Sequence, residues 1–512
     1  MFRRLLSVGG FTLLSRITGF ARDILMAWII GKNFLSDAVI VAFMFPNYFR
    51  AIFGEGAINP AFLPRYAALH ARGEHAAAAR FADQIFSWQM LAQLVILVVA
   101  LFAMPLLVTV IAPGFASNPE QMALTVSLAR ITFPYLILTL VAIQLSAMLN
   151  AIERFWAAAA WSSFQNLGMI VTLVCWRWFP NGAYAAAWGM LAGGVAQLFF
   201  MLWAAQREGL NLHIALPRWT ADVAEFFKAL GAVTLGTATT LIAPMIDTVL
   251  ASFLAEGSRT ALYYGDRVNQ LPLGVLGIAL GTVLLPAMSA RLAKNDRAGS
   301  DAAQNNAAAL TLLLTLPFAA VFFAIPDTIM TAIFAHGAFD VRAAGEAATA
   351  LGAYGIGLPA FALVRIFAST FYARHDTATP ARITFIAFAA NIAMKVALVW
   401  GLHLGIAGIA LGTAFGAWLN VAQLIWVGRR RGLLSVSDVF RHAIMPIVLS
   451  ASAAGAGAYA GVWLIGRTGI GGRWDDIVAL AAAGVLGGVF YAIVVLLFRR
   501  TLPLGRLSGR GA

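Results

Sequence analysis

Four arginines lie inside segments that are otherwise apolar enough to cross a bilayer: Arg16, Arg22, Arg50 and Arg267. A guanidinium keeps its proton in a protein, so burial does not neutralise it. Each such charge costs about 3 kcal/mol at the centre of a membrane helix. Charged side chains in spans usually face a water-filled cavity and mark what passes through it. Positive charge in a cavity therefore predicts an anionic cargo.

Polar side chains accompany these arginines at helical spacing. Asn47 and Arg50 share one helical face at i, i+3, so both can donate hydrogen bonds to phosphate oxygens. Arg16 and Asp23 also share a face, whereas Arg22 points about a third of a turn away. A structural interpretation pairs Arg16 with Asp23 or lets Arg22 reach the membrane interface. Three charges so close together exceed what one structural pair needs, which favours a binding role.

Three carboxylates are candidates for gating ion pairs: Asp23, Glu55 and Asp266. Glu55 lies near the end of its span, where a gate and an interface ion pair are equal alternatives. Asp266 directly precedes Arg267, and neighbouring residues on a helix point to different faces. The two charges of this dipeptide therefore do not simply neutralise each other.

A second polar set lies in later spans and consists of Asp247, Asn391, Lys395 and Thr413. Asn391 and Lys395 share a face at i, i+4. A lysine inside a span needs a partner, and Asp247 is the available acid. A structural ion pair is the favoured interpretation, and a coupling site is the alternative. Arg130 and Arg365 also lie within spans, where lining the cavity and a structural role are equal alternatives.

The composition is that of a polytopic membrane protein. Of 512 residues, 61% are hydrophobic and only 11% are charged, whereas a soluble domain carries about 25% charged residues. The net charge of +13 is scattered over short loops without a basic domain, which argues against nucleic-acid binding. Cys175 is the only cysteine, so a disulfide within the chain is impossible. No P-loop, metalloprotease motif or nucleophile elbow is present, so we predict neither an enzyme nor a cofactor.

Fourteen apolar stretches are long enough to cross a bilayer, at about 20 residues each. They lie at 7–30, 34–56, 83–112, 122–149, 155–178, 183–205, 224–254, 260–289, 306–333, 345–372, 380–402, 405–427, 440–465 and 476–498. The first lacks a small-residue cleavage site, so we expect a span that stays in the mature protein.

The distribution of Lys and Arg among the loops predicts the orientation. With a cytoplasmic N-terminus, 22 of the 35 cations lie on the cytoplasmic side, 6 lie outside and the remaining 7 lie within spans. This bias predicts a multi-pass protein with both termini in the cytoplasm.

An internal repeat relates the two halves of the chain. Asp23 precedes Asp37-Ala38 by the same spacing that separates Asp247 from Ala261. Further matches are weaker and consist of Pro134 with Pro359 and Asn166 with Asn391. An even number of spans in each repeat gives both halves one orientation, with the repeat axis along the membrane normal.

The repeat and the spans together predict the domain organisation. We expect an all-α polytopic fold with fourteen transmembrane helices, in which two six-helix lobes surround a central cationic cavity and two C-terminal helices follow. The N-lobe would span 1–219, the C-lobe 220–431, and the last two helices with the C-terminus 432–512.

Several of these motifs resemble one known family. Ser15-Arg16-Ile-Thr-Gly-Phe-Ala-Arg22-Asp23, Pro46-Asn-Tyr-Phe-Arg50 and Glu55-Gly-Ala57 look like the N-terminal signature of the MurJ (MviN) lipid II flippases in the MOP exporter superfamily. Three later pieces agree with it: Tyr263-Tyr-Gly-Asp-Arg267, Pro272-Leu-Gly-Val275 and Ile333-Phe-Ala-His-Gly-Ala-Phe339. The resemblance covers essentially the whole chain.

The resemblance implies a lipid II flippase of the bacterial cytoplasmic (inner) membrane. Such a protein moves the undecaprenyl-pyrophosphate-linked disaccharide pentapeptide of peptidoglycan biosynthesis to the periplasmic leaflet by alternating access. The family's cavity arginines match Arg16, Arg22, Arg50 and Arg267, and its further functional acid matches Asp37. The implied partners are lipid II, membrane lipids and cell-wall synthesis machinery. The alternative is a polysaccharide-lipid or multidrug exporter on the same scaffold, although the cationic surplus argues against drug export.

Two features of the later spans allow competing interpretations. The small-residue run at Ala451–Ala458 either lines a groove for the lipid tail or packs two helices tightly. Some family members are similar in having a sodium site, which Asp247, Asn391 and Thr413 match. One turn after Asn391, however, this chain carries the cation Lys395. We therefore expect no sodium or other metal there, and a pair between Lys395 and Asp247.

Overall fold

The computed structural model describes residues 2–281, 284–294, 296–435, 437–468 and 474–502. The side chains of residues 2–8, 55–57, 59, 232–241, 275–281, 285–287, 292 and 439 lie outside this description. Eleven helices within the described residues are long and apolar enough to cross a membrane. The all-α polytopic fold class is therefore confirmed, and the count of fourteen spans stays a prediction.

The described helices are α1 (Phe2–Ile30), α2 (Phe34–Phe49), α3 (Asn59–Ala71), α4 (His75–Ile111), α5 (Pro119–Thr132), α6 (Tyr135–Ala151), α7 (Phe155–Val174), α8 (Gly182–Arg207), α9 (Ala221–Ser252), α10 (Ser258–Gly281), α11 (Leu284–Ala293), α12 (Arg297–Ala324), α13 (Pro326–Phe334), α14 (Val341–Tyr372), α15 (Ala378–Val396), α16 (Gly405–Arg430), α17 (Asp438–Thr468) and α18 (Asp475–Leu497). The short π-helical segments are η1 (Arg50–Ile58) and η4 (Ala397–Gly401), and the 3-10 segments are η2 (Pro113–Ser117) and η3 (Trp176–Trp178).

Three predicted spans are helical but are not among the eleven apolar helices. Helix α1 covers the span at 7–30, α9 covers 224–254, and α10 with α11 covers 260–289. Charged residues interrupt the apolar sequence of α1 and α10, as the sequence already indicated.

The chain divides into two compact units. Unit 1 consists of Met1–Arg259 with Gly337–Phe339, and unit 2 consists of Thr260–His336 with Asp340–Ala512. Unit 1 extends beyond the predicted lobe boundary at residue 219, because α9 packs against α3, α4 and η1. Compactness and sequence repetition are different criteria, so the lobes predicted from the repeat stay a prediction.

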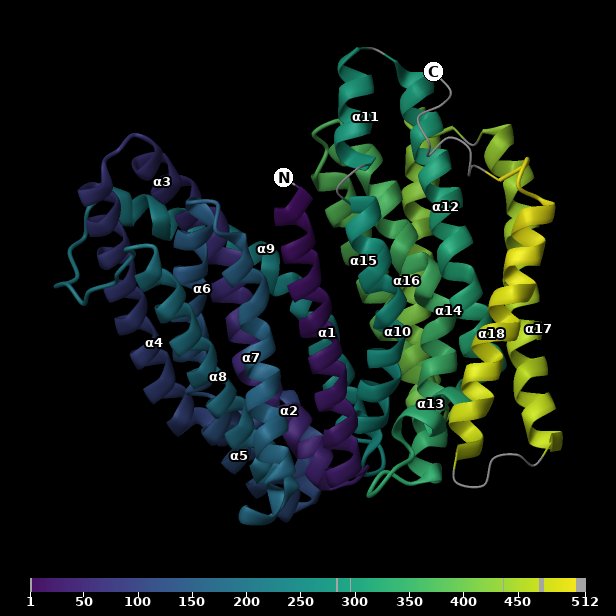
Figure 1. Ribbon diagram of the computed structural model, residues 1–512, viewed down its shortest axis with the longest axis horizontal. Helices are drawn as coiled ribbons and strands as arrows, with labels where there is room; N and C mark the ends of the chain where they lie inside the picture. The colour runs from purple at the N-terminus through teal and green to yellow at the C-terminus, as the bar shows by residue number, and fades with distance from the viewer. Residues whose placement is uncertain (1, 282–283, 295, 436, 469–473, 503–512) are drawn as a thin grey trace. The chain divides into compact units, whose positions relative to one another are not determined.

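Within unit 1, α7 packs between α1 and α8 (Figure 1). Gly168 of α7 and Gly193 of α8 face each other so closely that a Cβ on Gly168 would lie 2.4 Å from the Gly193 Cα. Small residues allow the backbones of membrane helices to approach in this way. The α7–α8 pair therefore forms a tightly packed support for α1, which carries Arg16 and Arg22.

Prolines at matching places in the repeat have different effects on the helices. Pro134 separates α5 from α6, whereas Pro359 lies inside the continuous helix α14. Proline removes one backbone donor and crowds the preceding turn, and α14 stays continuous where it packs against α12, α13 and α16. In α2, Pro46 is followed one turn later by the π-helical segment η1, so the helix changes its type after this proline.

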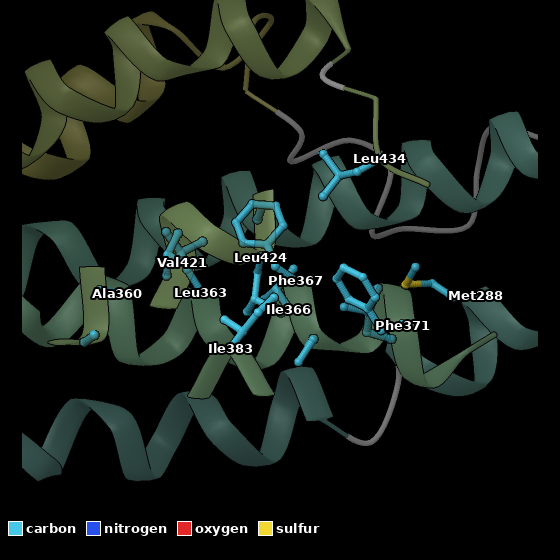
Figure 2. Packing of buried hydrophobic residues seen from close by; sticks show 14 residues of the cluster. Met288, Ala360, Leu363, Ile366, Phe367, Phe371, Ile383, Val421, Leu424 and Leu434 are labelled. Carbon is cyan, nitrogen blue, oxygen red and sulfur yellow. The ribbon is translucent and has the colours of Figure 1, made fainter. Parts of the chain in front are cut away.

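In unit 2, a cluster of buried apolar residues joins α14 to its neighbours (Figure 2). Phe371 and Leu363 of α14 pack with Leu424 of α16, Ile383 of α15 and Met288 of α11. A buried aromatic or leucine side chain contributes roughly 1.5–3 kcal/mol relative to exposure in water, although inside a membrane close packing takes over from that term. Helix α14 is thus the central packing element of unit 2.

Helices α17 and α18 lie side by side through their small residues (Figure 1). A Cβ on Gly457 would lie 2.7 Å from the Leu486 carbonyl oxygen, and one on Gly461 would lie 2.7 Å from the Ala483 nitrogen. The close-packing interpretation of the run at 451–458 is therefore confirmed at its C-terminal end. The lipid-tail groove stays a prediction.

Candidate functional site

Arg22 is fixed by a buried carboxylate and an amide in unit 1. Its Nε and Nη2 donate hydrogen bonds to Asp23 Oδ1 at 3.0 and 2.6 Å, and its Nη1 donates to Asn166 Oδ1 at 3.1 Å. The side chain of Asp23 is 0% exposed and that of Arg22 is 14% exposed. The long arginine side chain folds back onto its sequence neighbour. The two groups therefore meet although the Cα–Cβ bonds of the two residues point in different directions. The site thus presents a guanidinium held in one orientation.

Asn166 of α7 positions this arginine by fastening α7 to α1. Its Nδ2 donates to the Ser15 carbonyl oxygen at 3.0 Å and to Thr18 Oγ1 at 3.2 Å. The hydroxyls of Ser15 and Ser162 lie 2.7 Å apart one turn earlier on α7. The sequence marked Asn166 only as a counterpart of Asn391, and its role as a positioning residue requires the packing of α7 against α1.

Arg50 begins the π-helical segment η1. Its backbone N–H donates to the carbonyl oxygens of Pro46 and Asn47, and both Asn47 and Arg50 are half-buried. Gly54, one turn later, packs on α6, where a Cβ would lie 2.5 Å from Ile143 Cδ1. π-helical turns occur frequently at functional sites. Asn47 and Arg50 keep their α-helical spacing ahead of this segment, because the Arg50 N–H still bonds to the carbonyl oxygen four residues earlier, and their joint use stays a prediction.

Arg16 and Glu55 differ from the other predicted site residues of unit 1. Arg16 is exposed on α1, two turns before the network of Arg22. The hydrogen bonds described for Asp23 come from Arg22, which donates two, and a pair of Arg16 with Asp23 stays a prediction. The side chain of Glu55 lies outside the described residues, so its gating role stays a prediction.

Asp37 forms a buried contact with the loop between α9 and α10. Its Oδ2 accepts a hydrogen bond from the backbone N–H of Gly257 at 2.7 Å. Gly257 has a φ of +80°, in the left-handed region where a side chain is strained. Lys32 Nζ also donates to the Glu256 carbonyl oxygen at 3.3 Å, so two side chains form hydrogen bonds with this loop. Asp37 thus has a structural contact here, and its role toward cargo stays a prediction.

Asp266 and Arg267 lie on α10, and both are half-buried. Asp266 Oδ2 accepts a hydrogen bond from Gln270 Nε2 at 2.5 Å. The preceding Tyr264 is buried in unit 2, with its ring centroid 4.8 Å from that of Phe334 on α13. Packing of Tyr264 sets the rotation of α10 and thereby the direction in which the Asp266-Arg267 dipeptide faces.

The predicted coupling residues are divided between the units. Asp247 lies on α9 in unit 1, whereas Asn391 and Lys395 lie on α15 in unit 2. Lys395 is only 2% exposed and packs against Gly412 of α16, where a Cβ would lie 2.4 Å from Lys395 Cγ. The Asn391 Oδ1 is buried and has no hydrogen-bond partner among the described residues. The pair of Lys395 with Asp247 stays a prediction.

Thr413, the fourth coupling candidate, has its hydroxyl occupied within its own helix. Its Oγ1 donates to the Ile409 carbonyl oxygen at 3.1 Å, as a threonine in a helix commonly does. Among the described residues, no group of three or more His, Cys, Asp or Glu side chains lies close enough to hold a metal ion.

Arg259 is a residue of this region that the sequence did not single out. It was counted among the outer-loop cations, but its Nε donates to Thr248 Oγ1 of α9 at 2.9 Å. Arg259 and Asp247 both lie within electrostatic range of Tyr48, whose buried hydroxyl has no hydrogen-bond partner among the described residues. Its position at the start of a predicted span could have indicated this contact, because an arginine there can direct its side chain inward along the helix.

Outside the spans, unit 2 carries a polar network in the loop between α14 and α15. Hydrogen bonds from the hydroxyl and the backbone N–H of Thr379 lower the pKa of Asp376, and the guanidinium of Arg431 lowers it further. The Asp376 Oδ2 lies 2.7 Å from Thr379 Oγ1 and 3.0 Å from Arg431 Nη1. This network joins the end of α16 to the start of α15.

Comparison with known proteins identifies a family match over most of the chain. The model of the family described as "Lipid II flippase MurJ" matches residues 26–468. The chain is also 37% identical over 502 residues to the "Probable lipid II flippase MurJ" of Rhizobium tropici, covering 95% of this chain and 91% of that protein.

Solved structures with the same fold support the arrangement of the helices. A structure titled "Lipid II flippase MurJ, inward closed conformation" matches with a TM-score of 0.77 and 23% identity, covering 96% of this chain and 99% of that one. An inward-facing multidrug resistance MATE transporter of the MOP superfamily matches with a TM-score of 0.66 and 16% identity, covering 84% and 98%. At these identities the likeness concerns the fold alone.

Proposed function

This chain belongs to the lipid II flippase MurJ family, and we propose that it moves lipid II across the cytoplasmic membrane by alternating access. The main observation in favour of this proposal is the family match, which extends over most of the chain and nearly the full length of a relative. The cargo would be the undecaprenyl-pyrophosphate-linked disaccharide pentapeptide. The process is transport, with no covalent step on the cargo.

The fixed guanidinium of Arg22 supports recognition of a pyrophosphate. Asp23 and Asn166 together accept three of its hydrogen bonds, so little side-chain entropy is lost when an anion arrives. The buried carboxylate also offsets the cost of holding this charge in the membrane between transport cycles. We propose that Arg16, Arg50 and Arg267 supply further positive charge, with Asn47 as a neutral donor and Asp37 as a further functional acid.

Arginines in both units can couple cargo binding to the movement of the units. Arg22 lies in unit 1 and Arg267 in unit 2. An anion that contacts both would favour one arrangement of the units over the other, which is how a ligand shifts a conformational equilibrium. Asp23, Glu55 and Asp266 are proposed to form gating ion pairs in this cycle.

Substitution of single arginines tests this proposal. Arg50→Ala and Arg267→Ala should abolish lipid II translocation in vesicles while leaving thermal unfolding near that of the wild-type protein. Arg342→Ala, at an exposed arginine in the first turn of α14 before the predicted span, is the charge-matched control and should retain transport. Full transport and growth complementation by the Arg50 and Arg267 variants would refute the assignment.

A polysaccharide-lipid or multidrug exporter is the alternative, and the fold shared with a MATE transporter is the observation behind it. The two functions differ in the charge of the cargo. Purified protein should bind lipid II more tightly than undecaprenyl phosphate and should not bind a cationic dye. Tight binding of the dye with no binding of lipid II would favour drug export.

We also propose that Lys395 replaces a bound sodium ion. The ammonium would occupy the place of a cation beside Asn391, with Asp247 as its partner. Sodium should therefore leave thermal stability unchanged. Stabilisation by sodium chloride over potassium chloride that disappears in Asp247→Ala would contradict this proposal.

The location and the orientation in the membrane also follow from the family and from the charges of the loops. We propose a multi-pass protein of the bacterial inner membrane with both termini in the cytoplasm, lipid II and membrane lipids as its ligands, and cell-wall synthesis machinery as a further partner. Cysteines introduced near each terminus should react with membrane-impermeant maleimide only after the cells are opened.

A further inference from the structure

A groove on the surface of unit 1 runs between α4, η2 and α5. It has a volume of about 720 Å³, and its lining residues are Pro105, Ala116, Pro119, Met122, Ala123, Val126, Ser127, Arg130 and Ile131. Seven of these nine side chains are apolar, and Arg130 is the one charged residue among them. The groove is therefore an apolar channel with a single positive charge.

Arg130 is held in this groove by a carbonyl group that a proline leaves without its helical partner. In α4, Pro105 has no N–H to donate to the Leu101 carbonyl oxygen four residues earlier. Arg130 Nε donates to that oxygen at 3.1 Å. This hydrogen bond fixes the side chain across the groove from α5 to α4 through one of its five N–H donors.

The charge of Arg130 has no carboxylate beside it in the described part of the chain. No acidic residue lines the groove, and the acid nearest in sequence along α5, Glu120, is exposed in the first turn of that helix. Arginines within a membrane are normally paired or directed into water. The remaining guanidinium N–H groups of Arg130 can therefore take an anionic oxygen from outside the chain.

The surroundings of the groove face the lipid. On α4, Phe102 is 83% exposed and Leu106 is 66% exposed, although both are large apolar side chains. Such residues on a helix long and apolar enough to span a membrane contact acyl chains. A ligand that enters the groove beside them can therefore come from the bilayer.

The groove also reaches the end of the helices, where lipid headgroups lie. Its lining extends along α5 from Arg130 to Pro119, about 16 Å along the helix axis. Side chains on a helix lean toward its N-terminus, which directs Arg130 toward the same end. A phosphate that enters from the Pro119 end would thus pass Met122 to reach Arg130, and its acyl chains would continue toward the membrane centre beside the exposed Val98 and Val95 of α4.

We propose that this groove is a binding site for an anionic phospholipid of the surrounding membrane. The phosphate contacts the guanidinium of Arg130 inside the groove, and one acyl chain continues along the exposed apolar face of α4. The site lies on the surface of unit 1 and is separate from the network of Arg22. It goes beyond the proposed transport function, because a structural or regulatory lipid binds here without being moved.

Lipid binding to the full chain in detergent tests this proposal. Native mass spectrometry would compare retention of dioleoylphosphatidylglycerol with that of dioleoylphosphatidylcholine. The wild-type protein should prefer the anionic lipid by about tenfold, as expected for one charge-assisted contact. Arg130→Gln should remove the preference, whereas Arg130→Lys should retain most of it. Arg365→Gln, with the same change in net charge on an exposed arginine outside the groove, should behave as wild type.

A second variant separates binding from folding. Met122→Trp fills the groove without changing the charge and should also displace the anionic lipid, while both groove variants elute as single species. An undiminished preference in Arg130→Gln would overturn the proposal, as would an equal loss in Arg365→Gln. Displacement of phosphatidylglycerol by a lower concentration of undecaprenyl phosphate would assign the groove to a polyprenyl lipid and would overturn the phospholipid assignment.

Discussion

Asn166 and Asn391 occupy matching places in the internal repeat, but their surroundings differ. Asn166 in unit 1 donates to α1 and accepts a hydrogen bond from Arg22. In unit 2, the Asn391 Oδ1 is buried without a partner in the described residues, and the fully buried Lys395 lies one turn away. The same amide position thus supports a proposed cargo arginine in one unit and leaves an open acceptor beside a lysine in the other. The polar surroundings of these two positions of the predicted repeat therefore differ.

The largest effect should come from the buried carboxylate of unit 1. Asp23→Asn removes the negative charge that faces Arg22 inside the unit. We expect destabilisation by about 3 kcal/mol, the usual cost of breaking a buried pair from one side, together with loss of transport. Thermal unfolding in detergent and a vesicle translocation assay would measure both. Unchanged stability would show that Asp23 does not hold Arg22 in the membrane.

The two asparagines provide the direct test of the comparison. Asn166→Leu removes the contacts to Ser15, Thr18 and Arg22 and should cost about 2 kcal/mol. Asn391→Leu should stay within about 0.5 kcal/mol of wild type, because its amide oxygen has no partner to lose. Equal destabilisation of the two variants, measured by thermal unfolding, would break the comparison.

The space that Lys395 occupies depends on Gly412 of α16, which has no side chain. Gly412→Ala would place a Cβ 2.4 Å from Lys395 Cγ and should cost about 1–3 kcal/mol through overpacking. Gly401→Ala, where nothing lies within 4 Å of the added Cβ, is the matched control. In a Lys395→Ala background the cost of Gly412→Ala should fall, and a cost that stays the same would place the clash elsewhere.

The smallest effect concerns the exposed network of unit 2. Because hydrogen bonds lower the pKa of Asp376 in the folded protein, its stabilisation is complete above the unfolded value of about 3.9. It is lost as the pH falls through the lower folded value. Asp376→Asn should therefore flatten the acid limb of the stability–pH curve slightly and leave the profile near neutrality unchanged. A large loss of stability at neutral pH would show that this network contributes as much to stability as the buried Arg22–Asp23 pair of unit 1.

Much of the fold was predictable because the bilayer restricts the choices of an apolar chain. A segment in lipid must satisfy its backbone internally, so long apolar stretches indicate helices. The predicted stretches all coincide with helices. The interruptions of the helices were less predictable. Pro134 divides a span whereas Pro359 does not, because packing around α14 decides whether the helix stays continuous.

The residues of the candidate site were found because charge is rare in a span. Their partners were not, because a hydrogen bond between α1 and α7 joins residues about 150 positions apart. Spacing along one helix suggested Arg16 as a partner of Asp23, but Asp23 accepts two hydrogen bonds from its neighbour Arg22. Arg259 and Pro105 gained their importance only from the helices packed against them.

The sequence by itself determined the all-α membrane fold, the family, and the excess of positive charge within spans from which we predict an anionic cargo. These properties follow from composition and local motifs, which each segment carries independently of its neighbours. The tertiary structure decided which charged side chains are fixed and by what. Arg22 is held by an amide from α7, Arg130 by a carbonyl that Pro105 exposes, and Asp37 by the backbone of a distant loop. Such contacts depend on how helices cross, and a linear pattern does not specify that.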